Sequence, residues 1–148
     1  MAEQQASAPG RTLQCVVVTP EHALLDEPAD FVALPMYDGQ LGVLPGRAPL
    51  IGRLGIGELR MRHGSVTKRL FVDGGFAQIR GDVVTVLTPS ALEEKDIKPD
   101  AVQQAAESAR TQVPTTEEQF AAKEKELQRA RAKLRMIQRH RPGESAGH

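Results

Sequence analysis

Histidine, cysteine and serine are among the side chains of this 148-residue chain that could act in catalysis or hold a metal. The four histidines, His22, His63, His140 and His148, are scattered along the sequence without the short spacing that metal ligands show. Ser65 and Ser90 lie in predicted turns, and no histidine and acid are placed to activate either hydroxyl. We therefore predict no catalytic residue and no metal site, and a protein that is not an enzyme.

Cys15 is the single cysteine, so an internal disulfide is excluded. Because it lies in an apolar, strand-like run, we expect a small core residue rather than a reactive thiol, which suits a reducing compartment. The run Gly52-Arg53-Leu54-Gly55-Ile56-Gly57 has neither the glycine spacing of a dinucleotide fingerprint nor a following Gly-Lys-Ser/Thr. We interpret it as a plain turn rather than a phosphate loop.

Charge is balanced over the whole chain but divided within its last third. Residues 123–141 hold eight basic and two acidic residues, whereas residues 91–119 hold three basic and seven acidic ones. Two solvated helix faces that attract each other modestly would explain this division. The alternative is that the basic segment also docks on an acidic surface of a partner.

The N-terminal part of the chain has an all-β pattern, because short apolar or alternating runs are separated by Gly, Pro and Asp. Strands are predicted at residues 13–19, 31–34, 40–44, around 59–61, at 66–72 and at 83–87, with Asp73-Gly74-Gly75 breaking the fifth of them. Many short strands at this spacing predict a β-sandwich or flattened barrel over residues 13–90.

After Pro89 the strand pattern stops and helix-forming residues dominate. Pro99 is placed to open a first helix, with an apolar stripe at Val102, Ala105, Ala106, Ala109 and Val113, and Pro114 ends it. A capping box, either Thr115 with Glu118 or Thr116 with Gln119, opens a second helix. The short connection predicts an antiparallel helical hairpin over residues 91–141. Residues 1–12 and 142–148 are expected to be disordered, and no run is apolar enough for a signal peptide or a membrane span.

The most specific stretch runs from Asp38 to Leu50, where three glycines and two prolines alternate with apolar residues. Asp38-Gly39 is a strong turn signal, residues 40–44 read as a brief strand, and Pro45-Gly46 turns the chain again. Gln40 and Arg47 are the polar side chains that we expect to face outward.

This stretch resembles the signature of the epsilon subunits of F-type ATP synthases, in which Gly-Glu-Leu-Gly, an aliphatic pair and Pro-Gly-His-Ala-Pro-Leu follow one another. Gln40 stands at the Glu position and Arg47 at the His position, while every glycine and proline of the pattern is kept. A second match is Val72-Asp73-Gly74-Gly75-Phe76 followed by Val83 to Leu87. With the helical tail, the resemblance covers roughly residues 13 to 140.

The resemblance implies an N-terminal β-sandwich, a C-terminal helical hairpin and a place in the central stalk of a rotary motor. In that family the sandwich packs on the gamma subunit and touches the c-subunit ring, so that proton flow is coupled to ATP synthesis elsewhere. By position, Asp38, Gly39, Gln40 and Arg47 correspond to the ring-facing loop. We expect a bacterial subunit on the cytoplasmic face of the inner membrane, attached only through its partners.

The tail is similar to the family's regulatory hairpin, which in some members extends into the catalytic alpha/beta hexamer and blocks ATP hydrolysis. Arg129, Arg131, Lys133 and Arg135 are then the candidate inhibitory surface. Some members bind ATP on the hairpin through Ile/Leu-Asp-x-x-Arg-Ala. Here Lys98 and Ala101 stand at the Asp and Arg positions, so we predict no nucleotide site and no cofactor.

The competing interpretation is a free-standing β-sandwich binding module whose basic helical tail docks on RNA or anionic lipid. Aromatic residues are not interleaved with the basic ones, and Phe120 is the only aromatic residue of the predicted second helix. Because stacking on aromatic rings and a broad apolar face are what such ligands need, this composition favours a protein partner.

Overall fold

The computed structural model describes residues 11–139. The chain forms two compact units, residues 1–92 and residues 93–148. Apart from Arg11 and Thr12, the predicted disordered ends lie outside the described residues.

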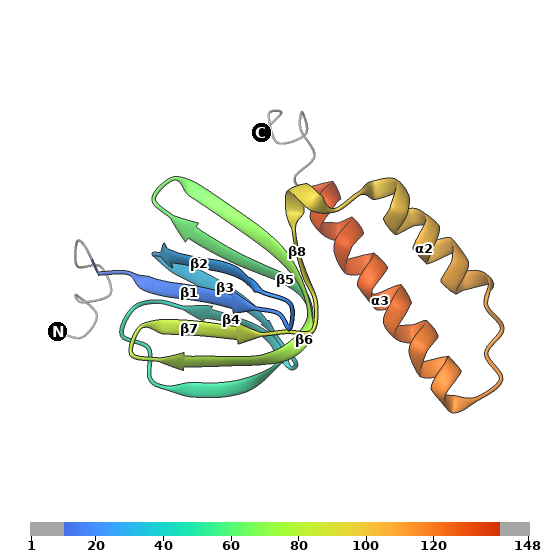
Figure 1. Ribbon diagram of the computed structural model, residues 1–148, viewed down its shortest axis with the longest axis horizontal. Coiled ribbons are helices and arrows are strands. Elements are labelled where there is room, and N and C mark those ends of the chain that lie inside the picture. The colour runs from blue at the N-terminus through green and yellow to red at the C-terminus, as the bar shows by residue number, and fades with distance from the viewer. Residues whose placement is uncertain (1–10, 140–148) are drawn as a thin grey trace. The chain divides into compact units, whose positions relative to one another are not determined.

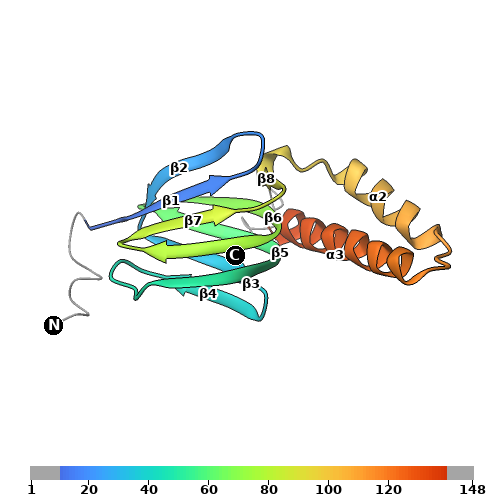
Figure 2. The same cartoon turned by 60° about the horizontal axis from the view of Figure 1, so that its bottom comes forward.

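The first unit is a strongly curved β-sheet whose strands fold over one another as two layers (Figures 1 and 2). Its strands are β1 (Leu13–Val18), β2 (Ala23–Ala29), β3 (Phe31–Met36), β4 (Gly39–Val43), β5 (Leu50–His63), β6 (Val66–Arg80), β7 (Val83–Leu87) and β8 (Ala91–Glu93). The order across the sheet is β2-β1-β7-β6-β5-β3-β4, and β8 pairs with β6. β1 and β7 run parallel, whereas β5 and β6 form a long antiparallel hairpin.

The space between the layers is filled by aliphatic side chains from alternate strand positions. Leu13, Cys15 and Val17 of β1 are buried while the residues between them are half-buried, as the two-residue period of a strand requires. Val, Leu and Ile dominate the cluster, which fits a chain without tryptophan. The predicted fold class, a β-sandwich followed by two helices, is confirmed.

Two glycine-containing runs were assigned wrongly from sequence. Residues 52–57 belong to the long strand β5 rather than to a turn, and β6 continues through Asp73-Gly74-Gly75 instead of breaking there. Gly74 and Gly75 take positive φ angles of 74° and 108°, which bend the strand without ending its pairing. A Cβ on Gly75 would lie 2.0 Å from the Leu87 carbonyl oxygen, so this position requires glycine because another strand passes very close.

Two strands were not predicted. β2 contains Pro28, which is compatible with its place at an edge of the sheet. β8 follows Pro89, in a segment without an obvious strand pattern, and is held by pairing with β6. Both strands owe their conformation to their neighbours rather than to local sequence preference.

The second unit contains the short 3-10 helix η1 (Glu94–Asp96), α2 (Pro99–Thr111) and α3 (Glu117–Arg139). Pro99 opens α2 as predicted, and Val102, Ala106 and Ala109 are buried along it. Ala105 and Val113 of the predicted stripe are exposed instead, because α2 ends at Thr111 and its buried face is narrower than the pattern indicated. At the start of α3 the Gln119 N–H donates to Thr116 Oγ1 at 3.1 Å, which confirms the second of the two capping alternatives.

Candidate partner-binding surfaces

The glycine- and proline-rich segment forms the edge strand β4 and the turns at its two ends. Gly39 at φ 135° follows the turn at Tyr37-Asp38, and Gly46 at φ 90° lies in the turn after β4. Asp38, Gly39, Gln40 and Arg47 are all exposed. At about 3.3 Å per residue β4 spans roughly 15 Å, so Gln40 and Arg47 lie at opposite ends of this strand.

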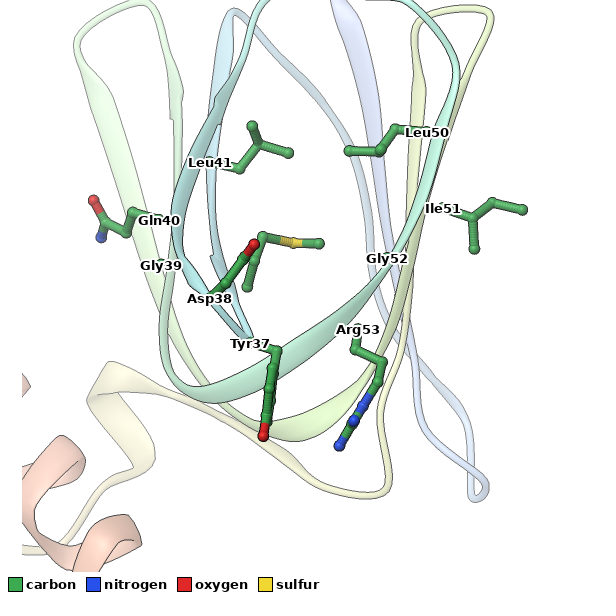
Figure 3. Close-up of a pocket in the computed structure, with 10 residues that line it drawn as sticks. Tyr37, Asp38, Gly39, Gln40, Leu41, Leu50, Ile51, Gly52 and Arg53 are labelled. Atoms are coloured by element: carbon green, nitrogen blue, oxygen red, sulfur yellow. The ribbon is translucent and has the colours of Figure 1, made fainter.

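A groove of about 620 Å³ lies between the β3–β4 turn and the first residues of β5 (Figure 3). It is lined by Met36, Tyr37, Asp38, Gly39, Gln40, Leu41, Leu50, Ile51, Gly52 and Arg53. Figure 3 shows Leu41 and Leu50 turned toward each other, the Asp38 carboxylate turned inward and the Gln40 amide pointing away. The groove therefore has apolar walls and one acidic group, while Gln40 presents its amide to the outside.

Tyr37 and Arg53 close one end of this groove. The Arg53 guanidinium carbon lies 4.4 Å from the centre of the Tyr37 ring, a cation–π contact. The Tyr37 N–H donates to the Arg53 carbonyl oxygen at 2.8 Å, which ties the β3–β4 turn to β5. These two contacts fix where the Asp38 end of β4 lies.

The opposite end of β4 is held by Asp82, in the turn between β6 and β7. The Gly46 N–H donates to Asp82 Oδ1 at 2.8 Å, and Arg11 Nε donates to Asp82 Oδ2 at 3.0 Å. Asp82 has φ 65° and is the one non-glycine residue with positive φ among residues 11–139. The hydrogen bond from Gly46 and, after it, the Arg11 guanidinium hold the pKa of the Asp82 carboxyl below its ordinary value. The carboxylate thus fixes the turn that carries Arg47.

The outer face of strands β5, β6, β7 and β1 carries apolar side chains among polar ones, since Gln14, Gln78, Arg80 and Thr85 lie on the same face. Register places Phe76 beside Leu87, and Leu87 beside Val18, while Ile51, Val16 and Val83 extend the same face. Phe76 and Leu87 are each 54% exposed and Ile51 is 72% exposed. A hollow of about 440 Å³ with an almost wholly apolar lining opens where residues 18–20, 75–76 and 87–89 meet. The contiguous apolar row of Val18, Leu87 and Phe76, next to this hollow, is typical of a surface that a partner covers.

The four basic residues predicted to act together on α3 lie on two sides of the helix. Arg131 and Arg135, four residues apart, are exposed and form no ion pair with any residue in the range 11–139. Arg129 and Lys133 form the other row and are half-buried, and Arg129 Nη1 donates to Glu126 Oε1 at 2.6 Å. An approaching acidic surface would therefore meet Arg131 and Arg135 first.

Groups that could do chemistry are not gathered anywhere in the described part of the chain. Within it no three His, Cys, Asp or Glu residues are arranged to hold a metal ion. Burial raises the pKa of the Cys15 thiol to about 12, with the nearby carboxylates of Glu27 and Asp26 adding to the effect. Neither α2 nor α3 is long and apolar enough to cross a membrane.

Comparison with known proteins places the chain in a family. The beta-sandwich domain of the ATP synthase delta/epsilon chain matches residues 12–94. An ATP synthase epsilon chain of Rhodopirellula baltica is 50% identical over 124 residues, covering 84% of this chain and 97% of the relative. The chain belongs to the ATP synthase epsilon chain family. A second family member, from Acidithiobacillus ferridurans, is 43% identical over 133 residues, 88% of this chain and 94% of the relative.

Solved structures from ATP synthases show the same fold. A chain from the Euglena gracilis mitochondrial ATP synthase, in a structure of OSCP, F1 and the c-ring, has a TM-score of 0.65 at 23% identity and covers 95% of this chain and 86% of its own. A chain from the Tetrahymena thermophila central stalk and c-ring has a TM-score of 0.65 at 13% identity, covering 84% and 96%. At these identities the likeness concerns the fold alone.

Sequence reasoning missed two parts of these surfaces. Arg53, which it placed in a plain turn, lines the groove with Asp38, and Asp82 holds the family's signature turn from a distant hairpin. The apolar outer face did leave a signal, because β1 reads as apolar on both faces. In the structure the half-buried side of β1 continues the exposed face.

Asp82 provides a test of how the signature turn is held. We expect Asp82→Ala to lose about 1 to 2 kcal/mol of unfolding free energy, because the Gly46 N–H loses its acceptor. Asp82→Asn keeps an acceptor and tolerates positive φ, so it should lose less. Urea unfolding of the three proteins at pH 7 measures the order.

The charge of Asp82 also sets a pH dependence. Because its folded pKa is lowered, the carboxylate stabilises the fold above its unfolded pKa of about 3.9, and this contribution is lost as pH falls through the folded pKa. The advantage of wild type over Asp82→Asn should therefore shrink between about pH 5 and pH 2. A constant advantage across that range would show that the charge has no part in holding the turn.

Proposed function

We propose that this chain is a non-catalytic rotor subunit of the central stalk of an F-type ATP synthase, where it couples proton flow to ATP synthesis performed by other subunits. Its similarity to epsilon chains over 84% of its length carries the proposal. The sandwich would reach the cytoplasmic face of the cell membrane through its partners. No observation favours the alternative of a free-standing module that binds RNA or anionic lipid.

The outer face of the sandwich is the proposed surface for the gamma subunit. Phe76 and Leu87 stand side by side there with about half of each side chain exposed, next to the apolar hollow. Burying Phe76 and Leu87 against a partner would remove their exposed apolar surface from water, and this hydrophobic free energy would favour binding. Arg53 borders the patch beside Phe76 and would lie at its polar rim.

Replacing Phe76 and Leu87 together by alanine should weaken binding to isolated gamma subunit by about 2 kcal/mol or more, roughly 30-fold. Val66→Ala is the matched control, because Val66 is 59% exposed but lies at the far end of β6. Titration calorimetry measures both affinities, and circular dichroism checks the fold. Equal affinities for the double variant and wild type would remove this face from the interface.

The β4 segment is the proposed ring-facing surface, with Asp38, Gly39 and Gln40 at one end and Arg47 at the other. Because about 15 Å of strand separates the two ends, they would contact the c-ring at two separate places. Gln40 offers a neutral amide that points outward, so its contact would be a hydrogen bond rather than an ion pair.

A Gln40→Cys variant should form a disulfide with a cysteine placed in the polar loops of the ring. The native chain is the control, since its single thiol, Cys15, is buried and has a pKa raised to about 12. Gel analysis of the oxidised, assembled complex detects the cross-linked pair. If the fully assembled complex gave no such product, the β4 end would not face the ring.

The helical hairpin is the proposed brake on ATP hydrolysis, acting on the catalytic alpha/beta hexamer when extended. Arg131 and Arg135 support this, as exposed charges on one face of α3 that form no ion pair within the described residues. Arg129 and Lys133 are half-buried in the described structure. They would join the contact with the hexamer once α3 separates from the residues that cover them. A difference of about 1.4 kcal/mol in favour of the inhibiting state would hold roughly nine-tenths of the complexes inactive.

Adding back a chain that ends at Leu92 should therefore raise ATP hydrolysis by up to about tenfold over the full chain at equal occupancy. Proton pumping per ATP should be unchanged, because the sandwich keeps its stalk and ring contacts. A full chain with Arg131→Gln and Arg135→Gln should give an intermediate rate. Equal hydrolysis with the full and shortened chains would exclude an inhibitory hairpin, and failure of both to bind would exclude a stalk subunit.

A further inference from the structure

The turn between α2 and α3 lacks the usual helix C-terminal cap. Helices commonly end with a glycine at positive φ, whose N–H groups satisfy the last carbonyls. α2 ends instead at Thr111 with Gln112 in an extended conformation, and Pro114 follows two residues later. The cap N–H of Gln112 reaches only the Ala109 carbonyl, at 3.3 Å. Other carbonyls at the end of α2 therefore need donors from elsewhere.

Lys123, on the second turn of α3, supplies that donor. Its Nζ donates to the Gln112 carbonyl oxygen at 2.9 Å and to the Arg110 carbonyl oxygen at 3.3 Å. A cation at the C-terminal end of a helix is also favoured by the helix dipole. The side chain is half-buried, and it lines a hollow with Pro114 and Phe120. One side chain of α3 thus caps the neighbouring helix.

At the end of α2, Thr111 Oγ1 donates to the Ser108 carbonyl oxygen at 3.0 Å, and the remaining polar contacts of this turn belong to the start of α3. Gln119 Oε1 accepts from the Thr115 N–H at 2.7 Å and from Thr115 Oγ1 at 2.9 Å, and Thr116 Oγ1 accepts from the Gln119 N–H. The two partners of each of these bonds lie within five residues of one another, so the bonds survive if the two helices separate. The bonds of Lys123 join α3 to α2 and must break.

We propose that Lys123 is the latch of the hairpin: its ammonium group holds the carbonyl end of α2 against α3, and the hairpin opens only when this contact is released. The effect on ATP hydrolysis rests on the proposed function, whereas the latch is a property of the chain by itself. α2 buries Val102 and two alanines, and α3 buries Met136 beside two alanines, so most of the buried apolar side chains of the two helices are small. A charged hydrogen-bond donor therefore makes up a considerable share of what keeps the helices together.

The test compares Lys123→Met with Lys125→Met in the full chain. Met keeps the aliphatic stem and removes the donor, and Lys125 is exposed on the same helix without a hydrogen bond in the described structure. Spin labels on cysteines at Gln104 and Gln128, exposed positions on α2 and α3, report the distance between the helices. Cys15 stays unlabelled because it is buried.

We expect Lys123→Met to raise the fraction of chains with separated helices by about three- to tenfold, a modest change because the contact is near the surface. Lys125→Met should leave the distance distribution unchanged, and Lys123→Arg, which keeps donors, should restore the closed form. Circular dichroism separates opening, which keeps α2 and α3 helical, from unfolding. Matching distributions for Lys123→Met and wild type would overturn the latch.

In the assembled complex, an open hairpin is the form expected to inhibit, so Lys123→Met should lower ATP hydrolysis relative to Lys125→Met. If the distances lengthen in the free chain while hydrolysis stays the same, the latch stands and the proposed brake fails. If the distances do not change, the latch fails whatever the shortened chain does to hydrolysis. The two proposals can therefore fail separately.

Discussion

The close approach of β7 to β6 at Gly75 is the constraint on which the sandwich surfaces depend. A Cβ at this position would meet the Leu87 carbonyl oxygen and the backbone of Thr88, so any side chain would force the two strands apart. With glycine there, β6 bends and still pairs with β5 from Leu50 to His63. The same bend sets Phe76 beside Leu87, which creates the apolar outer face and the hollow at its end. The placement of Phe76, Leu87 and the hollow thus depends on the absence of a side chain at Gly75.

Strands and helices could be predicted wherever the local pattern matched the final environment. The apolar run of β1 and the proline and capping signals of α2 and α3 needed no tertiary information. The wrong assignments of residues 52–57 and 73–75 arose at glycines. The sequence by itself does not distinguish a glycine that permits a close backbone contact from one that permits a turn. Only the pairing of β5 with β6 distinguishes them, and that pairing joins residues up to 29 positions apart in sequence, as Leu50 with Ile79 shows. β8 was missed for the related reason that its pairing with β6, not its own sequence, makes it a strand.

The candidate surfaces were predictable as segments but not as sets of side chains. The signature pattern located β4, yet strand direction places Gln40 and Arg47 at opposite ends, and only the structure shows Asp38 turned inward while Gln40 points out (Figure 3). On α3 a run of basic residues spaced by two suggested one surface. The helical period of 3.6 residues separates Arg131 and Arg135 from Arg129 and Lys133, so the run forms two rows with different burial. Asp82 was beyond prediction, because its backbone at positive φ and its reach to Gly46 arise from the folded sheet.

The two units differ in how their parts are held together, and this difference suits the proposed roles of a rigid stalk domain and a hairpin that opens. In the sandwich, large aliphatic side chains from both layers are fully buried and every interior strand is paired on both sides, so opening it would expose the whole core at once. In the hairpin, α2 buries only Val102 and two alanines and α3 buries Met136 and two alanines, so hydrophobic association gives its closed form less free energy than the aliphatic core gives the sandwich. Polar contacts such as that of Lys123 can then set the balance between closed and open forms, because the competing terms are small. A hairpin closed by large apolar residues would be too stable to open within a few kcal/mol, whereas small residues and a charged hydrogen bond leave that equilibrium adjustable.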